Sequence, residues 1–135
     1  MLKKSLDGLR RRLLRSRAKK IIIQEKLLPC FVRNISLKYP KVTIILFGSR
    51  AQNTQLPYSD YDIAVIFEKV DDRIRLIEDI RRMKPRGLPL DLIVLAKEEL
   101  SDPIIARMFR KSKILYDGLG LREHLAAISG NRSNI

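Results

Sequence analysis

The fold of this 135-residue chain is decided by residues 42–65, which read VTIILFGSRAQNTQLPYSDYDIAV. The first six residues are apolar or β-branched without interruption, and they predict a buried strand that ends at Gly48. The residues from Tyr61 to Phe67 predict a second buried strand. Between the two strands we expect a short helix that begins at about 49–53 and then a polar loop. Polar groups therefore collect where two apolar strands meet a turn.

Three carboxylates accompany these strands. Asp60 and Asp62 stand two residues apart at the start of the second strand, so their side chains point to one face. Asp91 lies in a later apolar run, residues 88–95, where we expect it to be buried at a cost of several kcal/mol unless it has a partner. A Lys or Arg could be that partner. A cation shared with Asp60 and Asp62 is the simpler explanation, because carboxylate oxygens are the ligands that Mg²⁺ prefers.

Gly48 and Ser49 are candidates for contact with a phosphate group. A glycine between a strand and a helix lets the backbone approach a ligand closely, and successive backbone N–H groups and the Ser49 hydroxyl supply donors. The same dipeptide after a strand is more often a simple turn. The dipeptide therefore gains its meaning only together with the three carboxylates.

The rest of the chain predicts an α+β (α/β) fold, with a small mixed sheet of about 3–5 strands flanked by helices. We expect a helix over about 71–84, with Ile74, Ile77, Ile80 and Met83 on one stripe. Further along, the pattern predicts a strand over 89–95, a helix after Ser101-Asp102-Pro103, a strand or helix end at 113–116, a helix over 121–128 and a polar tail over 129–135.

Residues 1–39 form a basic N-terminal segment that we separate from a domain at 40–135. The segment holds 12 Lys or Arg and 2 acidic residues, whereas residues 40–135 hold 16 and 13. We expect one or two amphipathic helices over 2–28, ended by Pro29, and a short helix or turn up to Lys38. Such a surface would bind a polyanion such as RNA, or an acidic protein. The alternative is a solvated helix face that only keeps the protein soluble.

The sequence predicts neither a membrane span nor a disulfide. No apolar run approaches the roughly 18 residues that a span requires. The first twenty residues resemble a transit peptide or a membrane-surface helix, but Asp7 and Glu25 interrupt the pattern, so we expect a cytoplasmic protein. Cys30 is the single cysteine, which excludes an internal disulfide and a cysteine metal cluster.

The combined motif resembles the minimal nucleotidyltransferases of the DNA polymerase beta superfamily over about residues 40–117. It consists of Gly48-Ser49, a ten-residue spacer, Asp60-x-Asp62 and a later strand with Asp91. The resemblance implies that Asp60 and Asp62 bind two Mg²⁺ ions, and that Asp91 is a ligand that also helps to deprotonate an attacking hydroxyl. It further implies that Gly48 and Ser49 hold a nucleoside triphosphate.

Two positions beside the motif complete the comparison with the family. Arg50 follows the serine, as it commonly does in that family, and the resemblance implies a contact with phosphate. Asn53 stands where the family often has glycine. Because Asn tolerates the left-handed backbone conformation, we expect the turn to survive this change.

The resemblance implies an enzyme that transfers a nucleoside monophosphate, AMP when ATP is the substrate, to a hydroxyl acceptor. Small members of the family are often paired with a helical HEPN-type protein in toxin–antitoxin systems, and they modify a tyrosine of that partner. Transfer to a small molecule or to an RNA end is an alternative. So is a noncatalytic subunit that binds nucleotide or RNA, and the apolar stripes of residues 2–28 would also suit a homo-oligomer. The presence of all three carboxylates with Gly48-Ser49 favours an enzyme.

Overall fold

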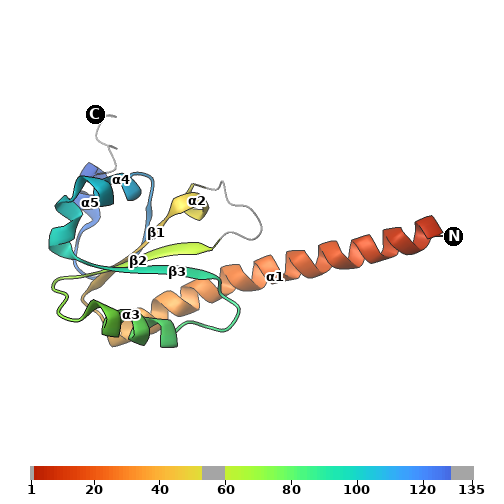
Figure 1. Cartoon of the computed structure of the whole chain (residues 1–135), viewed down its shortest axis with the longest axis horizontal. Helices are drawn as coiled ribbons and strands as arrows, with labels where there is room; N and C mark the ends of the chain where they lie inside the picture. The colour runs from red at the N-terminus through yellow and green to blue at the C-terminus, as the bar shows by residue number, and fades with distance from the viewer. Residues whose placement is uncertain (1, 53–59, 129–135) are drawn as a thin grey trace.

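The computed structural model describes residues 2–52 and 60–128, and within 2–25 it describes the side chains of residues 8–12 and 15. It shows one sheet with helices on both faces and a long helix that projects from the body (Figure 1). The elements are α1 (Leu2–Lys38), β1 (Val42–Phe47), α2 (Gly48–Ala51), β2 (Tyr61–Phe67), α3 (Arg73–Arg82), β3 (Leu90–Ala96), the 3₁₀ helix η1 (Lys97–Ser101), α4 (Pro103–Met108), β4 (Lys113–Asp117) and α5 (Arg122–Ile128).

The sheet has four strands in the order β3-β2-β1-β4. β1 pairs antiparallel with both β2 and β4, whereas β2 and β3 are parallel. This mixed sheet confirms the predicted α+β fold, and residues 113–116 belong to a strand rather than to a helix end. The pairing also brings the end of β1 to the starts of β2, β3 and β4. We call this side of the sheet the Gly48 end.

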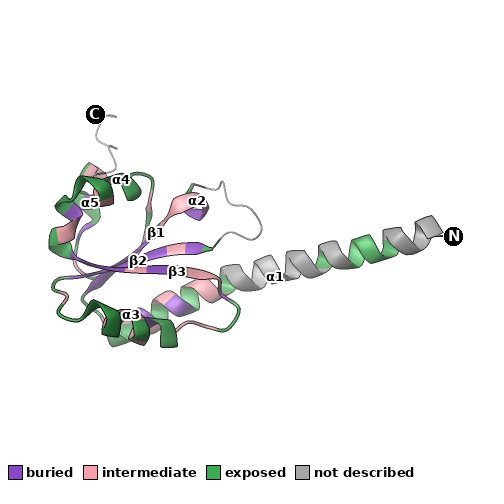
Figure 2. Ribbon diagram, in the orientation of Figure 1, coloured by how far each residue is buried: buried purple, intermediate pink, exposed green. Residues whose placement is uncertain are grey.

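Each face of the sheet carries its own apolar cluster. Buried residues follow the central strands (Figure 2). On one face, side chains from the strands pack against α1 and α3, with Phe31, Ile35 and Ile80 fully buried. On the other face, they pack against η1, α4 and α5 through Leu100, Phe109, Leu121 and Leu125. Because side chains alternate along a strand, every second residue of β2 faces α1 and α3, and the others face α4 and α5.

The helix α1 does not end at Pro29, contrary to the sequence-based expectation. Proline removes one backbone hydrogen bond and usually breaks a helix. Here the two turns that follow bury Phe31 and Ile35 completely against the sheet. Burial of two such side chains contributes about 1.5–3 kcal/mol each, which is enough to offset the proline. The two predicted segments therefore form one helix.

The direction of α1 follows from the short connection to β1. Because α1 ends at Lys38 and β1 starts at Val42, the C-terminal end of α1 lies near the start of β1. From there the helix extends along the sheet toward the Gly48 end, with its N-terminus farthest away. The six residues of β1 span about 20 Å, which a helix covers in about 13 residues. Since α1 has 37 residues, its first part extends beyond the Gly48 end (Figure 1).

The predicted apolar stripe of α3 is only partly correct. Ile80 is buried and Ile77 is partly buried, but Ile74 is 71% exposed. A step of three residues falls short of a full helical turn, so a stripe with this spacing drifts around the helix away from the sheet. The helix is also shorter than expected, because Asp72 caps it by accepting a hydrogen bond from the Arg75 N–H at 3.2 Å.

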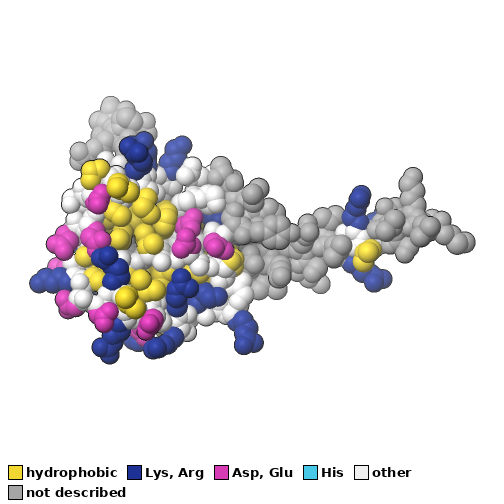
Figure 3. Space-filling model, viewed as in Figure 1, with side chains coloured by type: hydrophobic (Ala, Val, Ile, Leu, Met, Phe, Trp, Pro, Cys, Tyr) yellow, Lys and Arg dark blue, Asp and Glu magenta, His cyan; other side chains and the backbone are white. Residues whose placement is uncertain are grey.

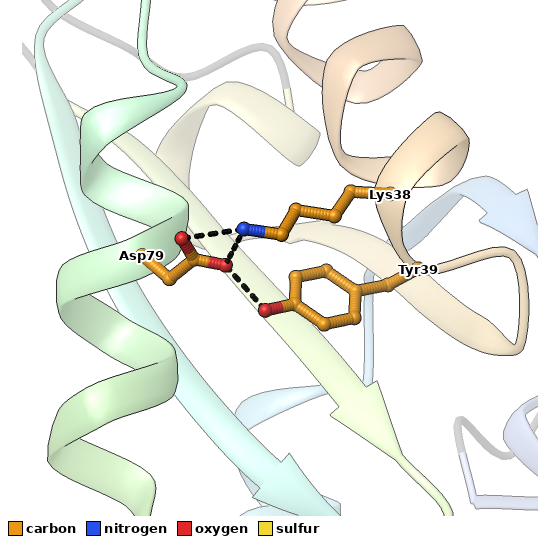
Figure 4. A network of polar contacts seen from close by, with 3 residues as sticks. All are labelled: Lys38, Tyr39 and Asp79. Atoms are coloured by element: carbon orange, nitrogen blue, oxygen red, sulfur yellow. Dashed lines mark hydrogen bonds and ion pairs between the residues drawn. The ribbon is translucent and has the colours of Figure 1, made fainter.

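A polar contact fastens the end of α1 to α3 (Figure 4). Lys38 Nζ lies 2.7 Å from the Asp79 carboxylate, and the Tyr39 hydroxyl donates a hydrogen bond to the same group. Burial and the hydrogen bond to the anionic Asp79 raise the pKa of Tyr39 to about 12. The hydrogen bonds from Lys38 and Tyr39 lower the pKa of Asp79. This network lies at the opposite side of the sheet from the Gly48 end.

Asp117 at the end of β4 joins the sheet to α5. Its carboxylate accepts hydrogen bonds from the buried Thr43 hydroxyl at 2.9 Å and from the N–H groups of Leu121 at 2.7 Å and Arg122 at 3.1 Å. Burial raises the pKa of Asp117, but these hydrogen bonds together with one from the Gly120 N–H outweigh it, and the pKa is lowered. The carboxylate therefore stabilises the fold in its charged form.

We expect Asp117→Ala to lower the free energy of unfolding by about 1–2 kcal/mol near neutral pH, because a helix cap is lost and the Thr43 hydroxyl loses its partner. Because the folded-state pKa is lowered, this stabilisation is present above the unfolded-state pKa of about 3.9 and is lost as the pH falls through the folded-state value. Urea unfolding at several pH values measures the difference. A gap between wild type and variant that widens in acid would contradict this account.

The described residues include no helix that is long and apolar enough to cross a membrane. Three predictions fall outside the described residues: the polar loop between the first two strands, the turn at Asn53 and the polar tail over 129–135.

Candidate active site

Asp62 and Asp91 lie side by side at the Gly48 end of the sheet. They are direct partners in the parallel register of β2 and β3, so their side chains leave the sheet on the same face. That face is the one that packs against α4 and α5 further along the strands. The two side chains are close enough for the charge of Asp91, and for hydrogen bonding with it, to raise the pKa of Asp62. The structure thus brings together two of the three carboxylates that the sequence singled out.

Asp91 is exposed, and the prediction that it is buried was wrong. The apolar residues around Asp91 do not enclose it, because β3 is the edge strand of the sheet and Asp91 is its second residue. The helices cover this face only further along the strand. The burial cost that motivated a cation partner is therefore absent at Asp91. What links Asp91 to the site is its position beside Asp62.

Asp60 is exposed and precedes β2. Tyr61 stands between Asp60 and Asp62, and its side chain belongs to the opposite cluster, packed toward α1 and α3. Asp60 is close enough to Asp62 for its charge to raise the pKa of Asp62. The third carboxylate therefore acts electrostatically on the same site.

Asp62 is the carboxylate at the centre of the group. Burial raises its pKa most, followed by the negative charges of Asp91 and Asp60 and by the hydrogen bond with Asp91. Two carboxyl groups that share a hydrogen bond need a proton between them, since two carboxylate anions offer only acceptors. The Asp62 side chain is thus poorly satisfied as an anion unless a positive charge joins it.

Gly48 closes the site from the side of β1. Its φ is +74°, a conformation that glycine adopts without cost. A Cβ atom at this position would lie 2.0 Å from Asp62 Oδ2. The absence of a side chain at Gly48 is therefore what leaves room for the Asp62 carboxylate, and it brings the backbone at the start of α2 against that group.

The donor set suits Mg²⁺ in its chemistry. Asp60, Asp62 and Asp91 offer hard carboxylate oxygens, and the repulsion that raises the pKa of Asp62 would be relieved by a cation in place of the shared proton. Within the described ranges, no group of three His, Cys, Asp or Glu is already arranged around a metal position.

Ser49 and Arg50 differ in their surroundings within α2. Ser49 is partly exposed at the Gly48 end, as a phosphate contact requires. Arg50 is only 7% exposed, and its guanidinium carbon lies 3.9 Å from the centroid of the Tyr61 ring. A contact between Arg50 and phosphate stays a prediction.

The sequence did not indicate an aromatic contact next to Asp62. Phe47 is the register partner of Asp62 and packs edge to face on the buried Phe109, with ring centroids 5.4 Å apart. Phe109 follows α4, more than sixty residues away in the chain. No local signal reports such a contact, because it depends on how α4 folds back over the sheet.

Comparisons with known proteins place the chain in a family. A family model described as nucleotidyltransferase domain matches residues 14–116. A Methanocaldococcus jannaschii protein described as "putative protein adenylyltransferase" is 33% identical, over 56% of this chain and 58% of its own length. This chain therefore spans little more than half of that relative.

Two solved structures are also similar. A "putative nucleotidyltransferase" from Sulfolobus solfataricus is 26% identical over 76% of this chain and 87% of its own, with a TM-score of 0.58. A chain from a complex of tri-AMPylated Shewanella oneidensis HEPN toxin with MNT antitoxin is 21% identical over 85% of this chain and 96% of its own, with a TM-score of 0.40, which is too low to bear on function. Because the family model covers more than half of the sequence, the chain belongs to the nucleotidyltransferase domain family.

Proposed function

We propose that this nucleotidyltransferase transfers AMP from ATP, or the corresponding group of another nucleoside triphosphate, to a hydroxyl group of a protein, namely a tyrosine of a HEPN-type helical partner. The observation that carries the proposal is the meeting of Gly48, Asp62 and Asp91 at one end of the sheet. A site with a bare backbone beside paired carboxylates suits a triphosphate and its counterions.

In this proposal the chain supplies the binding groups for both reactants. Gly48 and the Ser49 hydroxyl hold the triphosphate, and Asp60, Asp62 and Asp91 would hold two Mg²⁺ ions. When bound, such ions activate an attacking hydroxyl and neutralise charge on leaving pyrophosphate. Asp91, the exposed carboxylate, accepts the proton of the acceptor hydroxyl. The acceptor oxygen then bonds to the α-phosphorus as the bond to the β-phosphate breaks.

A protein acceptor has two supports. The curated relative is described as a protein adenylyltransferase. In addition, α1 extends beyond the Gly48 end, and its described side chains there are exposed and basic, with Leu9 54% exposed among them (Figure 3). We define the α1 arm as residues 8–26. We expect the exposed basic side chains of this arm to attract an acidic protein surface.

Transfer to an RNA end is the second candidate function. Among the side chains of the α1 arm that the structure describes, four arginines are exposed, and such a cluster attracts nucleic acid through counterion release. They are Arg10, Arg11, Arg12 and Arg15.

Labelling with ATP separates these candidates. The protein is incubated with α-labelled ATP and Mg²⁺, together with either a helical protein of the HEPN type or a single-stranded RNA, and products are followed on gels and by intact mass. We expect the protein partner to gain AMP, and the gain to disappear with Asp62→Asn. Label on RNA alone would favour the second candidate. Absence of label from both acceptors would contradict both.

The arm is tested by changing its charge. We expect replacement of the four arginines by alanine to weaken binding of the acidic partner at least about tenfold at low salt and to flatten its salt dependence. A matched control removes four exposed basic residues at the other side of the sheet, Lys41, Lys69, Arg75 and Lys97, and should leave binding unchanged. Equal effects of the two sets, measured by fluorescence anisotropy, would reduce the arm to a solvated face.

A further inference from the structure

The buried contact between Arg50 and Tyr61 has no role in the site described so far. Arginine is rarely buried, because removing its charge from water is costly. Here the side chain is 7% exposed, and its guanidinium lies over the Tyr61 ring at 3.9 Å, within the range of a cation–π contact. The contacts of Arg50 must therefore offset the free-energy cost of burying its charge.

Tyr61 is the residue between two carboxylates of the site, and it is fixed from two directions. Its ring is 4% exposed and belongs to the cluster on the side of α1 and α3. Its backbone N–H donates a hydrogen bond of 2.9 Å to the carbonyl oxygen of Pro89, just before β3. Arg50 covers the ring from α2, directly after Gly48 and Ser49.

Because side chains alternate along a strand, the direction of the Tyr61 ring determines the direction of the two neighbouring carboxylates. When the Tyr61 ring points into its cluster, its two neighbours must point to the other face, where Asp91 lies. A turn of the backbone at Tyr61 would swing both neighbouring carboxylates away from Asp91. Arg50 opposes that turn, because it holds the ring between α2 and the core.

We propose that Arg50 is a positioning residue: through its stack on Tyr61 it fixes Asp60 and Asp62 relative to Gly48 and Asp91. This inference rests on the proposed function for its catalytic readout. It differs from the role implied by the family resemblance, a contact between Arg50 and phosphate. A guanidinium that is 7% exposed and lies over a buried ring at 3.9 Å is held by that ring and shielded from a ligand in the open part of the site.

The two roles predict different kinetics. For a positioning residue, Arg50→Met and Tyr61→Leu lower kcat by about 100-fold, since small misplacement of reacting groups has that effect. The affinity for Mg-ATP, measured by calorimetry, stays within about threefold. Because the two residues act as a unit, kcat of the double variant is no lower than kcat of the less active single variant.

Arg50→Lys is the decisive variant, and it remains informative if Arg50→Met does not fold. Lysine keeps the positive charge but lacks the planar group that stacks on the ring. Positioning predicts that kcat stays low. Retained kcat in Arg50→Lys together with a loss of Mg-ATP affinity of tenfold or more in Arg50→Met would overturn the inference and assign Arg50 to phosphate binding.

Hydrogen exchange provides a readout that needs no reaction. We expect the Tyr61 amide to exchange at least about tenfold faster in Arg50→Lys than in wild type, whereas amides of the central strand β1, such as that of Ile44, keep their rates. An unchanged rate at Tyr61 would overturn the inference even if transfer is detected. If wild type transfers no nucleotide, the proposed function fails, but the exchange rate and Mg-ATP affinity still decide the role of Arg50.

Discussion

Replacing Asp62 with Asn is expected to reduce nucleotidyl transfer by at least about 10³-fold, because the site loses the charge at its centre. The same change should raise the melting temperature in metal-free buffer. Burial and the charges of Asp91 and Asp60 raise the pKa of Asp62, so its anion is unfavourable in the folded protein, and the neutral amide removes that repulsion. Activity and stability therefore move in opposite directions.

Thermal melts with and without Mg²⁺ complete this test. Wild type should gain stability when Mg²⁺ is added, and Asp62→Asn should gain much less. Asp72→Asn makes the same chemical change at the cap of α3, on the other side of the sheet, where Asn caps equally well, and it should leave transfer intact. Normal transfer by Asp62→Asn would refute the assignment of the carboxylates.

Gly48→Ala is expected to damage the site by a different route. The new Cβ would lie 2.0 Å from Asp62 Oδ2, so the carboxylate must leave its position, and transfer should fall by about 100-fold or more. The left-handed backbone adds a cost of about 1–2 kcal/mol to folding. Initial rates and urea unfolding measure the two effects separately.

Gly120→Ala is the matched control for the backbone cost. Its φ is +72°, close to that of Gly48, but no atom lies within 4 Å of the added Cβ. This variant should lose similar stability and keep its activity. If both glycine variants lose activity in proportion to stability, the close approach of Gly48 to Asp62 has no catalytic meaning.

The central strands of the fold could be predicted closely from the sequence. Both strands, residues 42–47 and 61–67, have the predicted bounds, because continuous apolar runs of six or seven residues leave few alternatives. The errors arose where tertiary packing decides. Pro29 lies within a helix because the next turns are buried, and Ile74 is exposed because its stripe drifts away from the sheet.

The candidate site was predicted in composition but not in detail. The motif identified Gly48, Asp62 and Asp91, and the register of the strands brings them together. The reasoning for Asp91 was wrong in one step, since its exposure depends on β3 being an edge strand, which local sequence does not reveal. The contact of Arg50 with Tyr61 joins residues eleven positions apart in the chain, and no periodic pattern reports it.

We propose that the carboxylates at the Gly48 end support the transfer of a nucleoside monophosphate from a nucleoside triphosphate to a hydroxyl acceptor. Parallel reactions with α-labelled and γ-labelled ATP, in wild type and Asp62→Asn, test it most directly. The account predicts that the acceptor takes up α-label alone, that γ-label appears in released pyrophosphate, and that both signals vanish in the variant. Uptake of γ-label, or α-label transfer that persists in Asp62→Asn, would contradict it.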